Sequence, residues 1–392
     1  MKTQLKTAVW ASVMSLFFAA CQKESRQSLQ NDAAFAEAAT ASLKNGENNK
    51  EGENNTGHVY TLNNQVIGNK VMDFIRSSNG TLTFSAAYAT GGNGSGGGLG
   101  NQGAVILTDD DDMLLAVNAG SNSISSFKIN NSGLSLKSTV NSGGMTPVSI
   151  AQHDDIVFVL NAGGTNNISG FELKDNGILQ PIPNSTRPLS AASTGPAQVS
   201  FLNGGKVLVI TEKGTNKIIT YAVNEDGIPG MMHSITSSSP TPFGFAAGKH
   251  DNIFVSEAVG GAPGASVLSS YDISNNGVIT LLEGSVGAGQ SAACWVVITS
   301  NGKYAYTTNT ASNNLSTFGI NNAGNISVAQ AISATTQAGP IDAALSKNSK
   351  YLYVLNSGGH SIQAYNVAGN GTLSFLQTVP GIPSGATGLA AR

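Results

Sequence analysis

The sequence predicts an all-β protein: a single seven-bladed β-propeller in which each blade is a four-stranded antiparallel sheet. Three observations lead to this prediction. The chain holds 47 Gly among 392 residues and only 11% charged residues, which suits many short strands joined by tight turns. A unit of about 48 residues recurs seven times. The end of the chain resembles the one strand that the first unit lacks.

The first twenty residues predict an export signal. Lys2 and Lys6 precede an apolar run from Ala8 to Ala20, which is too short to span a bilayer as a mature helix and stops at Cys21. The stretch Phe18-Ala19-Ala20-Cys21 resembles a lipobox, in which a signal peptidase cuts before the cysteine and the thiol carries diacylglycerol. We expect a lipoprotein anchored in the bilayer through acylated Cys21. The alternative is a plain secretory signal with a coincidental cysteine.

Residues 22–56 predict a flexible tether. They are rich in Asn, Glu, Lys, Gln and Ala without strand alternation, so they cannot bury enough apolar surface to fold. Their first residues, Gln22-Lys23-Glu24, look like the short signal that sends lipoproteins of Bacteroidota-type bacteria to the outer surface. We therefore expect an outer-membrane or cell-surface location. The expected domains are a signal peptide in 1–20, a lipidated tether in 21–56 and the propeller in 57–392.

The clearest repeat is an aromatic residue followed six positions later by a glycine. One blade cannot cover its own faces, so we expect the aromatic ring to stack against the neighbouring blade. The glycine falls in a tight turn, where a positive φ is inexpensive only for Gly. The seven pairs are Phe74/Gly80, Phe127/Gly133, Phe171/Gly177, Tyr221/Gly227, Tyr271/Gly277, Phe318/Gly324 and Tyr365/Gly371.

Upstream of each aromatic lies a β-rich run that closes on a polar residue. The chain enters at such a run, 58–63, which is a second strand, and its last residues, 385–392, resemble a first strand. We expect this carboxy-terminal strand to complete the first blade and close the ring, because closure removes free sheet edges. The six later runs end at Asn118, Asn161, Glu212, Glu257, Asn309 and Asn356.

The topology divides the loops between two rims of the ring. First strands start and second strands end on one rim, here called rim B, and the turns between first and second strands lie on the opposite rim A. Asp109 to Asp112 fall in a rim A turn, where we expect a solvated turn, with a calcium site as the alternative. The glycine-rich stretch 91–100 enters rim B without the ending of a phosphate-binding loop, so we interpret it as a pliable lip of the channel mouth.

Polar and aromatic residues at the channel entrance form the candidate ligand site. With 20 Lys+Arg against 23 Asp+Glu, the charge gives no reason to expect a nucleic acid partner. The chain has two cysteines, and we expect neither a metal site nor a cofactor. The expected ligand-binding residues are Gln102, Phe243, Glu257, Trp295, Asn309 and Asp342.

Several segments resemble the lactonase-type seven-bladed propeller family, which includes 6-phosphogluconolactonase and 3-carboxymuconate-type cyclases. They are Gly195-Pro196-Ala197-Gln198, the turn 301–304 and the strand ending 354–356, and the resemblance covers nearly all of residues 57–392. In family enzymes a Gly-Pro-Arg-His segment brings Arg and His to the channel, and a Glu ends the following strand. Here Ala197 and Gln198 stand at the Arg and His positions, so of this pattern only Glu212 survives.

These residues leave three hypotheses. The first is a surface propeller that binds a neutral or weakly charged ligand, a glycan or a protein, at the channel mouth. The second is a divergent lactone hydrolase or cyclase in which Glu212 acts as base, helped by Gln198 or His360. The third is a passive scaffold with no defined pocket. A phosphorylated lactone is not expected, because among the four Arg of the chain only Arg187 lies near the rim.

Overall fold

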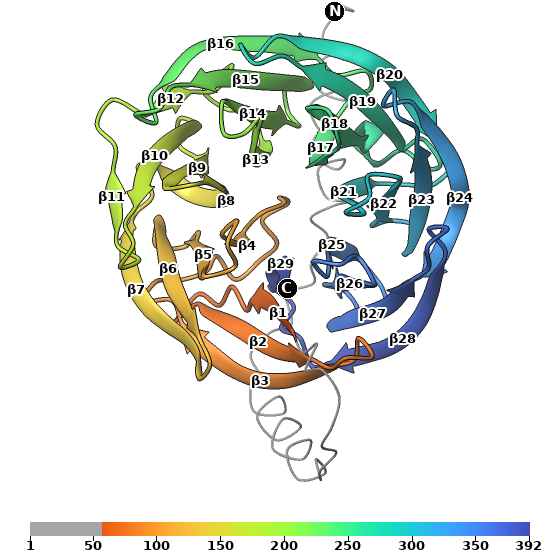
Figure 1. Cartoon of the computed structure of the whole chain (residues 1–392), viewed down its shortest axis with the longest axis horizontal. Coiled ribbons are helices and arrows are strands. Elements are labelled where there is room, and N and C mark those ends of the chain that lie inside the picture. Colours follow the sequence, from red (N-terminus) through yellow and green to blue (C-terminus); the bar gives the residue numbers. More distant parts are fainter. Residues whose placement is uncertain (1–56) are drawn as a thin grey trace, which may run out of the picture.

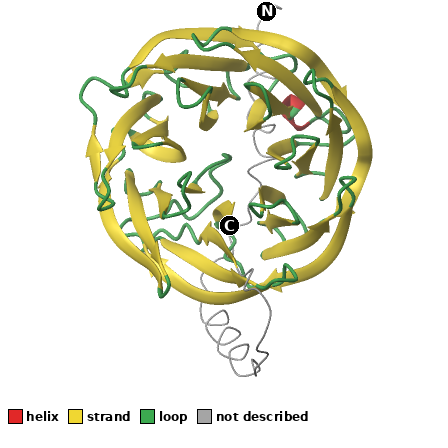
Figure 2. Ribbon diagram, in the orientation of Figure 1, coloured by secondary structure: helices red, strands yellow, loops and turns green. Residues whose placement is uncertain are grey.

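Seven antiparallel sheets stand around a central channel in the computed structural model, which describes residues 57–392 (Figure 1). In each blade the first strand lies next to the channel and the fourth lies on the outside (Figure 1). Strands make up almost all of the regular structure, and the single helical element in residues 57–392 is the 3₁₀ turn η2, Val259–Gly261 (Figure 2). The prediction of an all-β, seven-bladed propeller is confirmed.

The strands follow the chain around the ring. Blade 1 contains β29 (Thr387–Ala391), β1 (Gly57–Leu62), β2 (Lys70–Arg76) and β3 (Leu82–Ala89). Blade 2 contains β4 (Val105–Leu107), β5 (Met113–Asn118), β6 (Ser123–Asn130) and β7 (Gly133–Asn141). Blade 3 contains β8 (Met145–His153), β9 (Ile156–Gly163) and β10 (Asn167–Leu173), and its outer strand is split into β11 (Leu179–Pro181) and β12 (Arg187–Pro188).

The remaining four blades have the same strand order. Blade 4 contains β13 (Pro196–Leu202), β14 (Val207–Glu212), β15 (Lys217–Val223) and β16 (Pro229–Thr236). Blade 5 contains β17 (Pro242–Ala247), β18 (Asn252–Glu257), β19 (Val267–Ile273) and β20 (Ile279–Gly287). Blade 6 contains β21 (Ala293–Ile298), β22 (Tyr304–Asn309), β23 (Asn314–Ile320) and β24 (Ile326–Thr335). Blade 7 contains β25 (Pro340–Leu345), β26 (Tyr351–Asn356), β27 (Ser361–Val367) and β28 (Leu373–Pro380).

The two ends of the described chain close the ring as predicted. Strand β29 pairs antiparallel with β1, with Tyr60 opposite Ala390 and Thr61 opposite Leu389. Beyond the strand, the Arg392 N–H donates to the His58 carbonyl at 2.9 Å, and the His58 N–H donates back at 3.2 Å. The last strand thus supplies the backbone partners that β1 would otherwise lack on its channel side, and β29 becomes the inner strand of the first blade.

The repeated aromatic and glycine residues hold adjacent blades together. All seven third-strand aromatics are buried, at 2% exposure or less, and all seven paired glycines have a positive φ. The glycine turns also make a contact that the sequence did not indicate, because hydroxyl groups of the preceding blade donate to the glycine carbonyls. Tyr353 donates in this way to Gly80 at 3.0 Å, and Tyr306 donates to Gly371 at 2.9 Å.

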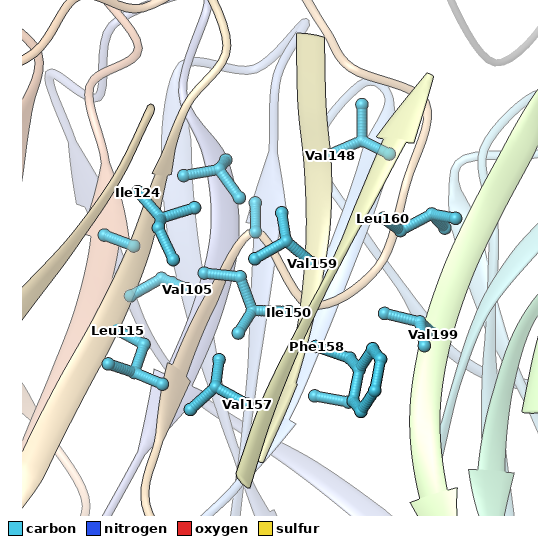
Figure 3. Close-up of a cluster of buried hydrophobic side chains, with 14 of the residues drawn as sticks. Val105, Leu115, Ile124, Val148, Ile150, Val157, Phe158, Val159, Leu160 and Val199 are labelled. Carbon is cyan, nitrogen blue, oxygen red and sulfur yellow. The ribbon is translucent and has the colours of Figure 1, made fainter. Parts of the chain in front are cut away.

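Aliphatic side chains fill the space between blades. Figure 3 shows Val105, Leu115 and Ile124 of blade 2 packed near Val148, Ile150 and Val157 of blade 3. Each fully buried side chain of this size contributes roughly 1.5–3 kcal/mol relative to an exposed one. The predicted signal peptide, Cys21 and the tether lie outside the described residues. Within 57–392 there is no helix long and apolar enough to cross a membrane.

Truncating the chain after Ala386 removes β29 and should destabilise the propeller by roughly 4 kcal/mol or more. The deletion exposes the edge of β1 and removes the buried side chain of Leu389. Thermal unfolding and light scattering of the truncated and full-length proteins measure the effect. A truncated protein that stays monomeric and unfolds at the same midpoint as the full-length protein would contradict this account of ring closure.

Candidate ligand site in the central channel

The end of the glycine-rich stretch and the residues that follow it enter the central channel before β4 begins (Figure 1). The Asn101 side chain donates to the Val148 carbonyl on the inner strand of blade 3. The Gln102 side chain donates to the Val296 carbonyl of blade 6 at 2.9 Å, and its backbone N–H donates to Ala197 of blade 4 at 3.1 Å. These residues therefore span the channel from one side to the other. We call residues 98–103 the plug.

Two aromatic residues predicted to bind a ligand pack against the plug. Trp295 donates its indole N–H to the Asn101 carbonyl at 2.5 Å. Its ring centroid lies 4.9 Å from that of Phe243, and both side chains are 2% exposed. Gly244 makes room for the plug, since a Cβ at this position would lie 2.2 Å from Oε1 of Gln102. Phe243 and Trp295 are thus covered by the chain itself and do not present free surfaces at the channel mouth.

Lys213 also holds the plug and was not identified from the sequence. Its ammonium group donates to the Gly100 carbonyl and lies 4.5 Å from the centroid of the Phe243 ring. Burial lowers the pKa of Lys213 to about 7. Its position in the sequence could have identified it, because Lys213 directly follows Glu212, which ends the second strand β14 on rim B.

Beyond the plug, the channel contains a cavity of about 450 Å³. Gln102 of the plug and Gln198 of β13 line it, together with Asp342 of β25. Its lining also includes Asp111 and Lys347, which belong to turns between first and second strands. The cavity therefore opens towards rim A, on the side opposite to the one predicted from the sequence.

Gln198 and Asp342 bring hydrogen-bonding groups to this cavity although both are almost fully buried. Gln198 is 8% exposed, and its carboxamide oxygen accepts the Phe245 N–H at 2.7 Å. Asp342 is 2% exposed, and its carboxyl accepts the N–H of Ala343 at 2.8 Å. Burial raises the pKa of Asp342 well above its usual range, and the backbone N–H groups of Ala343 and Leu389 oppose this shift only in part. Gln102, Gln198 and Asp342, three of the polar residues that line the cavity, were among the site residues predicted from the sequence.

Glu212, the candidate base, does not line this cavity. It is fully buried at the end of β14. One carboxylate oxygen accepts the Ser190 N–H at 2.9 Å, and the other accepts the hydroxyl groups of Ser190 and Thr215. These contacts tie the connection between blades 3 and 4 to the end of the second strand. The described position of Glu212 is that of a structural carboxylate.

Glu257 and Asn309 occupy equivalent positions in blades 5 and 6 and are also absent from the lining of the cavity. Glu257 accepts the hydroxyl groups of Ser269 at 2.7 Å and Tyr271 at 2.8 Å. Asn309 donates to the Ser316 hydroxyl at 2.8 Å. Burial raises the pKa of Glu257 above its usual value. In blades 5 and 6 the polar residue that ends the second strand therefore joins it to the third strand.

His360 and Arg187 lie apart from the cavity as well. His360 is exposed in the loop between β26 and β27, on rim B. Arg187 belongs to the outer strand β12. Its guanidinium donates to the carbonyls of Asn184 and Thr186, which lie within three positions of it in the sequence. Of the three candidate catalytic residues, only Gln198 reaches the cavity, so the structure does not assemble Glu212, Gln198 and His360 into one site.

The four aspartates of the rim A turn bind separate partners, and the Asp109 carboxylate lies 3.2 Å from Nδ1 of His153. Asp111 pairs with Lys347 at 2.5 Å, and Asp112 pairs with Lys128 at 2.7 Å. The Thr108 hydroxyl donates to Asp110 at 2.6 Å and lowers the pKa of that carboxyl. Among residues 57–392 no three His, Cys, Asp or Glu side chains are grouped so that they could hold a metal ion.

Replacing Glu212 or Glu257 by Gln should lower the free energy of unfolding by roughly 1–3 kcal/mol, because one acceptor of a buried hydrogen-bond network is lost. Glu225→Gln, in an exposed turn, serves as the control and should change the stability little. Chemical denaturation of the three variants measures the differences. Equal stability of all three would show that these carboxylates are not structural.

Replacing Asn101 by Ala should loosen the plug, because the Val148 carbonyl loses its donor and the Thr387 hydroxyl loses an acceptor. We expect faster amide hydrogen exchange in residues 98–103 with the blades unchanged. Asn370→Ala is a matched control in an exposed turn, where the side chain accepts one N–H from Thr372. Unchanged exchange in the plug would mean that other contacts hold it in place.

The comparisons with known proteins agree with this fold. Residues 277–387, from the turn before β20 to the start of β29, match the family described as "Lactonase, 7-bladed beta-propeller". No curated protein matches the sequence of the chain.

Solved structures resemble the chain over most of its length. A proposed 6-phosphogluconolactonase from Bacteroides uniformis is 19% identical with a TM-score of 0.67, and the match covers 84% of this chain and 99% of that one. A second, from Bacteroides fragilis, is 15% identical with a TM-score of 0.69, covering 88% and 100%. The periplasmic gluconolactonase of Pseudomonas aeruginosa is 14% identical with a TM-score of 0.67, covering 85% and 98%. The chain is thus a seven-bladed β-propeller that resembles the lactonase family, in sequence over residues 277–387 and in fold over most of its length.

Proposed function

We propose that this protein binds a small uncharged polar molecule in the channel cavity that opens on rim A. The observation that carries the proposal is the cavity of about 450 Å³ with Gln102, Gln198 and Asp342 in its lining. This volume lies within the range of sites that enclose small ligands. It supports a monosaccharide or a comparable molecule over a protein, which cannot enter a cavity of this size.

The charges around the cavity support an uncharged ligand. Lys347 is the one cationic side chain in its lining, and Asp111 already binds it at 2.5 Å. Asp109 adds a further negative charge at the mouth. An anionic ligand would therefore meet more carboxylates than free cations. The Gln198 carboxamide uses its oxygen to accept the Phe245 N–H, and its NH2 group can donate to the hydroxyl groups of a sugar.

The plug supports binding over hydrolysis. The Ala197 carbonyl accepts the backbone N–H of Gln102, and Gln198 accepts the N–H of Phe245. The resemblance to lactonases implies Arg and His at the positions of Ala197 and Gln198. In this protein a methyl group therefore stands in place of the cationic guanidinium, and a carboxamide stands in place of the imidazole that would transfer a proton. The second hypothesis, a hydrolase with Glu212 as base, gains no support from the position of that residue.

The proposal includes the location of the protein. With Cys21 lipidated and residues 22–56 as a tether, the propeller would bind its ligand at the outer membrane or the cell surface. Residue 57 begins β1 on rim A, so the tether leaves from the side on which the cavity opens. The ligand would then enter between the propeller and the membrane that holds it.

Isothermal titration calorimetry with D-glucose, D-galactose and N-acetyl-D-glucosamine tests the proposal. We expect at least one of the three to bind with a dissociation constant of about 1 mM. Ser200→Trp, which places a large side chain in the cavity lining on β13, should abolish this binding. Ser374→Trp on the outer strand β28 should leave it unchanged. Equal binding by the Ser200 variant would place the ligand elsewhere, and absence of binding by all three sugars would overturn the proposed ligand class.

A further inference from the structure

Asp342 is a buried carboxyl on the wall of the channel cavity. It lies on the inner strand β25, just after an irregularity in the pairing with β26 between Pro340 and Asp342. Its side chain is 2% exposed and lines the cavity. The backbone N–H groups of Ala343 and Leu389 donate to the carboxyl. Both of these groups donate to the Asp342 carboxyl, and neither accepts a hydrogen bond from it.

Asp342 has no counter-ion among residues 57–392, since none of the ion pairs there includes it. The other charged groups of the cavity lining are Asp109, Asp111 and Lys347, and Lys347 is bound to Asp111. The adjacent strands β29 and β21 carry no charged side chain.

Strand β22 also packs against β25 and brings Tyr304 and Tyr306, of which Tyr306 donates to the Gly371 carbonyl at 2.9 Å. Strand β26 brings two more tyrosines as its titratable groups. Their hydroxyl groups donate away from Asp342, Tyr351 to the Ser78 carbonyl at 2.6 Å and Tyr353 to the Gly80 carbonyl at 3.0 Å. A carboxyl that is removed from water without a cation nearby favours its protonated form.

We infer that Asp342 determines the specificity of the cavity by donating a hydrogen bond from its protonated carboxyl to an uncharged acceptor oxygen of the ligand. This inference rests on the proposed function, because it assigns a role inside the same cavity. The two backbone donors occupy acceptor lone pairs of the carboxyl and leave its O–H, the one donor of the protonated group, to bind an acceptor oxygen of the ligand. A carbonyl, hydroxyl or ring oxygen of a sugar is an acceptor of the required kind.

The hydrogen bond from protonated Asp342 makes ligand binding weaker as the pH rises. The donor is present while the carboxyl is protonated and is lost as the pH rises through the raised pKa of the folded protein. The unfolded chain releases this proton already near the ordinary value of 3.8. The folded protein therefore holds more protons between these two values, and its stability falls as the pH rises across that window.

Asp342→Asn is the decisive variant, because Asn has the same shape and keeps an N–H donor at every pH. Calorimetry with the neutral sugar that binds the parent should show affinity about tenfold weaker above the pKa of Asp342 than below it. The Asn variant should bind with the low-pH affinity throughout, and Asp342→Leu should not bind. Asp226→Asn, in an exposed turn of blade 4, should keep the pH profile of the parent.

Thermal unfolding without ligand gives a second readout. The midpoint of the Asn variant should exceed that of the parent by an amount that grows as the pH rises from about 4. Sugar binding by the parent that is independent of pH would overturn the inference and leave the proposed function standing. A midpoint gap that grows with pH while no sugar binds would overturn the proposed function and, with it, the ligand role of Asp342. A constant gap would show that Asp342 is not held protonated.

Discussion

The hydrogen bonds that hold the plug inside the ring decide which surfaces of the propeller can meet a ligand. A chain that enters a narrow channel must pair its backbone groups, and the inner strands supply the partners. The Gln102 carboxamide donates to the Val296 carbonyl at 2.9 Å and accepts the Val296 N–H at 3.3 Å. It therefore pairs with the backbone of the inner strand β21 as a neighbouring strand would. Trp295, Phe243 and Lys213 complete the packing on rim B. The free space of the channel is then left on rim A.

Much of the fold could be predicted because its signals are local and repeated. A Gly six residues after an aromatic marks a turn in every blade, since both the turn and the stacking recur. The plug at the end of the glycine-rich stretch was not predicted, because its partners are far away in the sequence. Asn101 bonds to a residue 47 positions later, and Gln102 to one 194 positions later. Glycine composition permits either a lip or a plug, and only these distant contacts distinguish them.

The candidate site could be predicted only in part, because a polar residue next to the channel has two physical uses. Glu257 and Asn309 end second strands, and their side chains bind the third strand. Gln198 and Asp342 lie on inner strands, where there is no further strand on the channel side. The sequence reveals the strand on which a residue lies but does not by itself exclude either use. Phe243 and Trp295 also lie on inner strands but are covered by the plug, so the strand position alone does not separate scaffold from site.

Glu257 and Asp342 show how the two kinds of position affect the protonation of a buried carboxyl. Glu257 receives two hydroxyl donors from β19, and these oppose the rise of its pKa that burial causes. Asp342 receives backbone N–H groups only, and its pKa is raised further. An acid kept protonated at a cavity wall carries an O–H whose partner must come from water or from a bound molecule. A ligand with an acceptor oxygen at this position would recover the hydrogen bond in a site shielded from solvent, where such a bond is stronger than at an exposed surface.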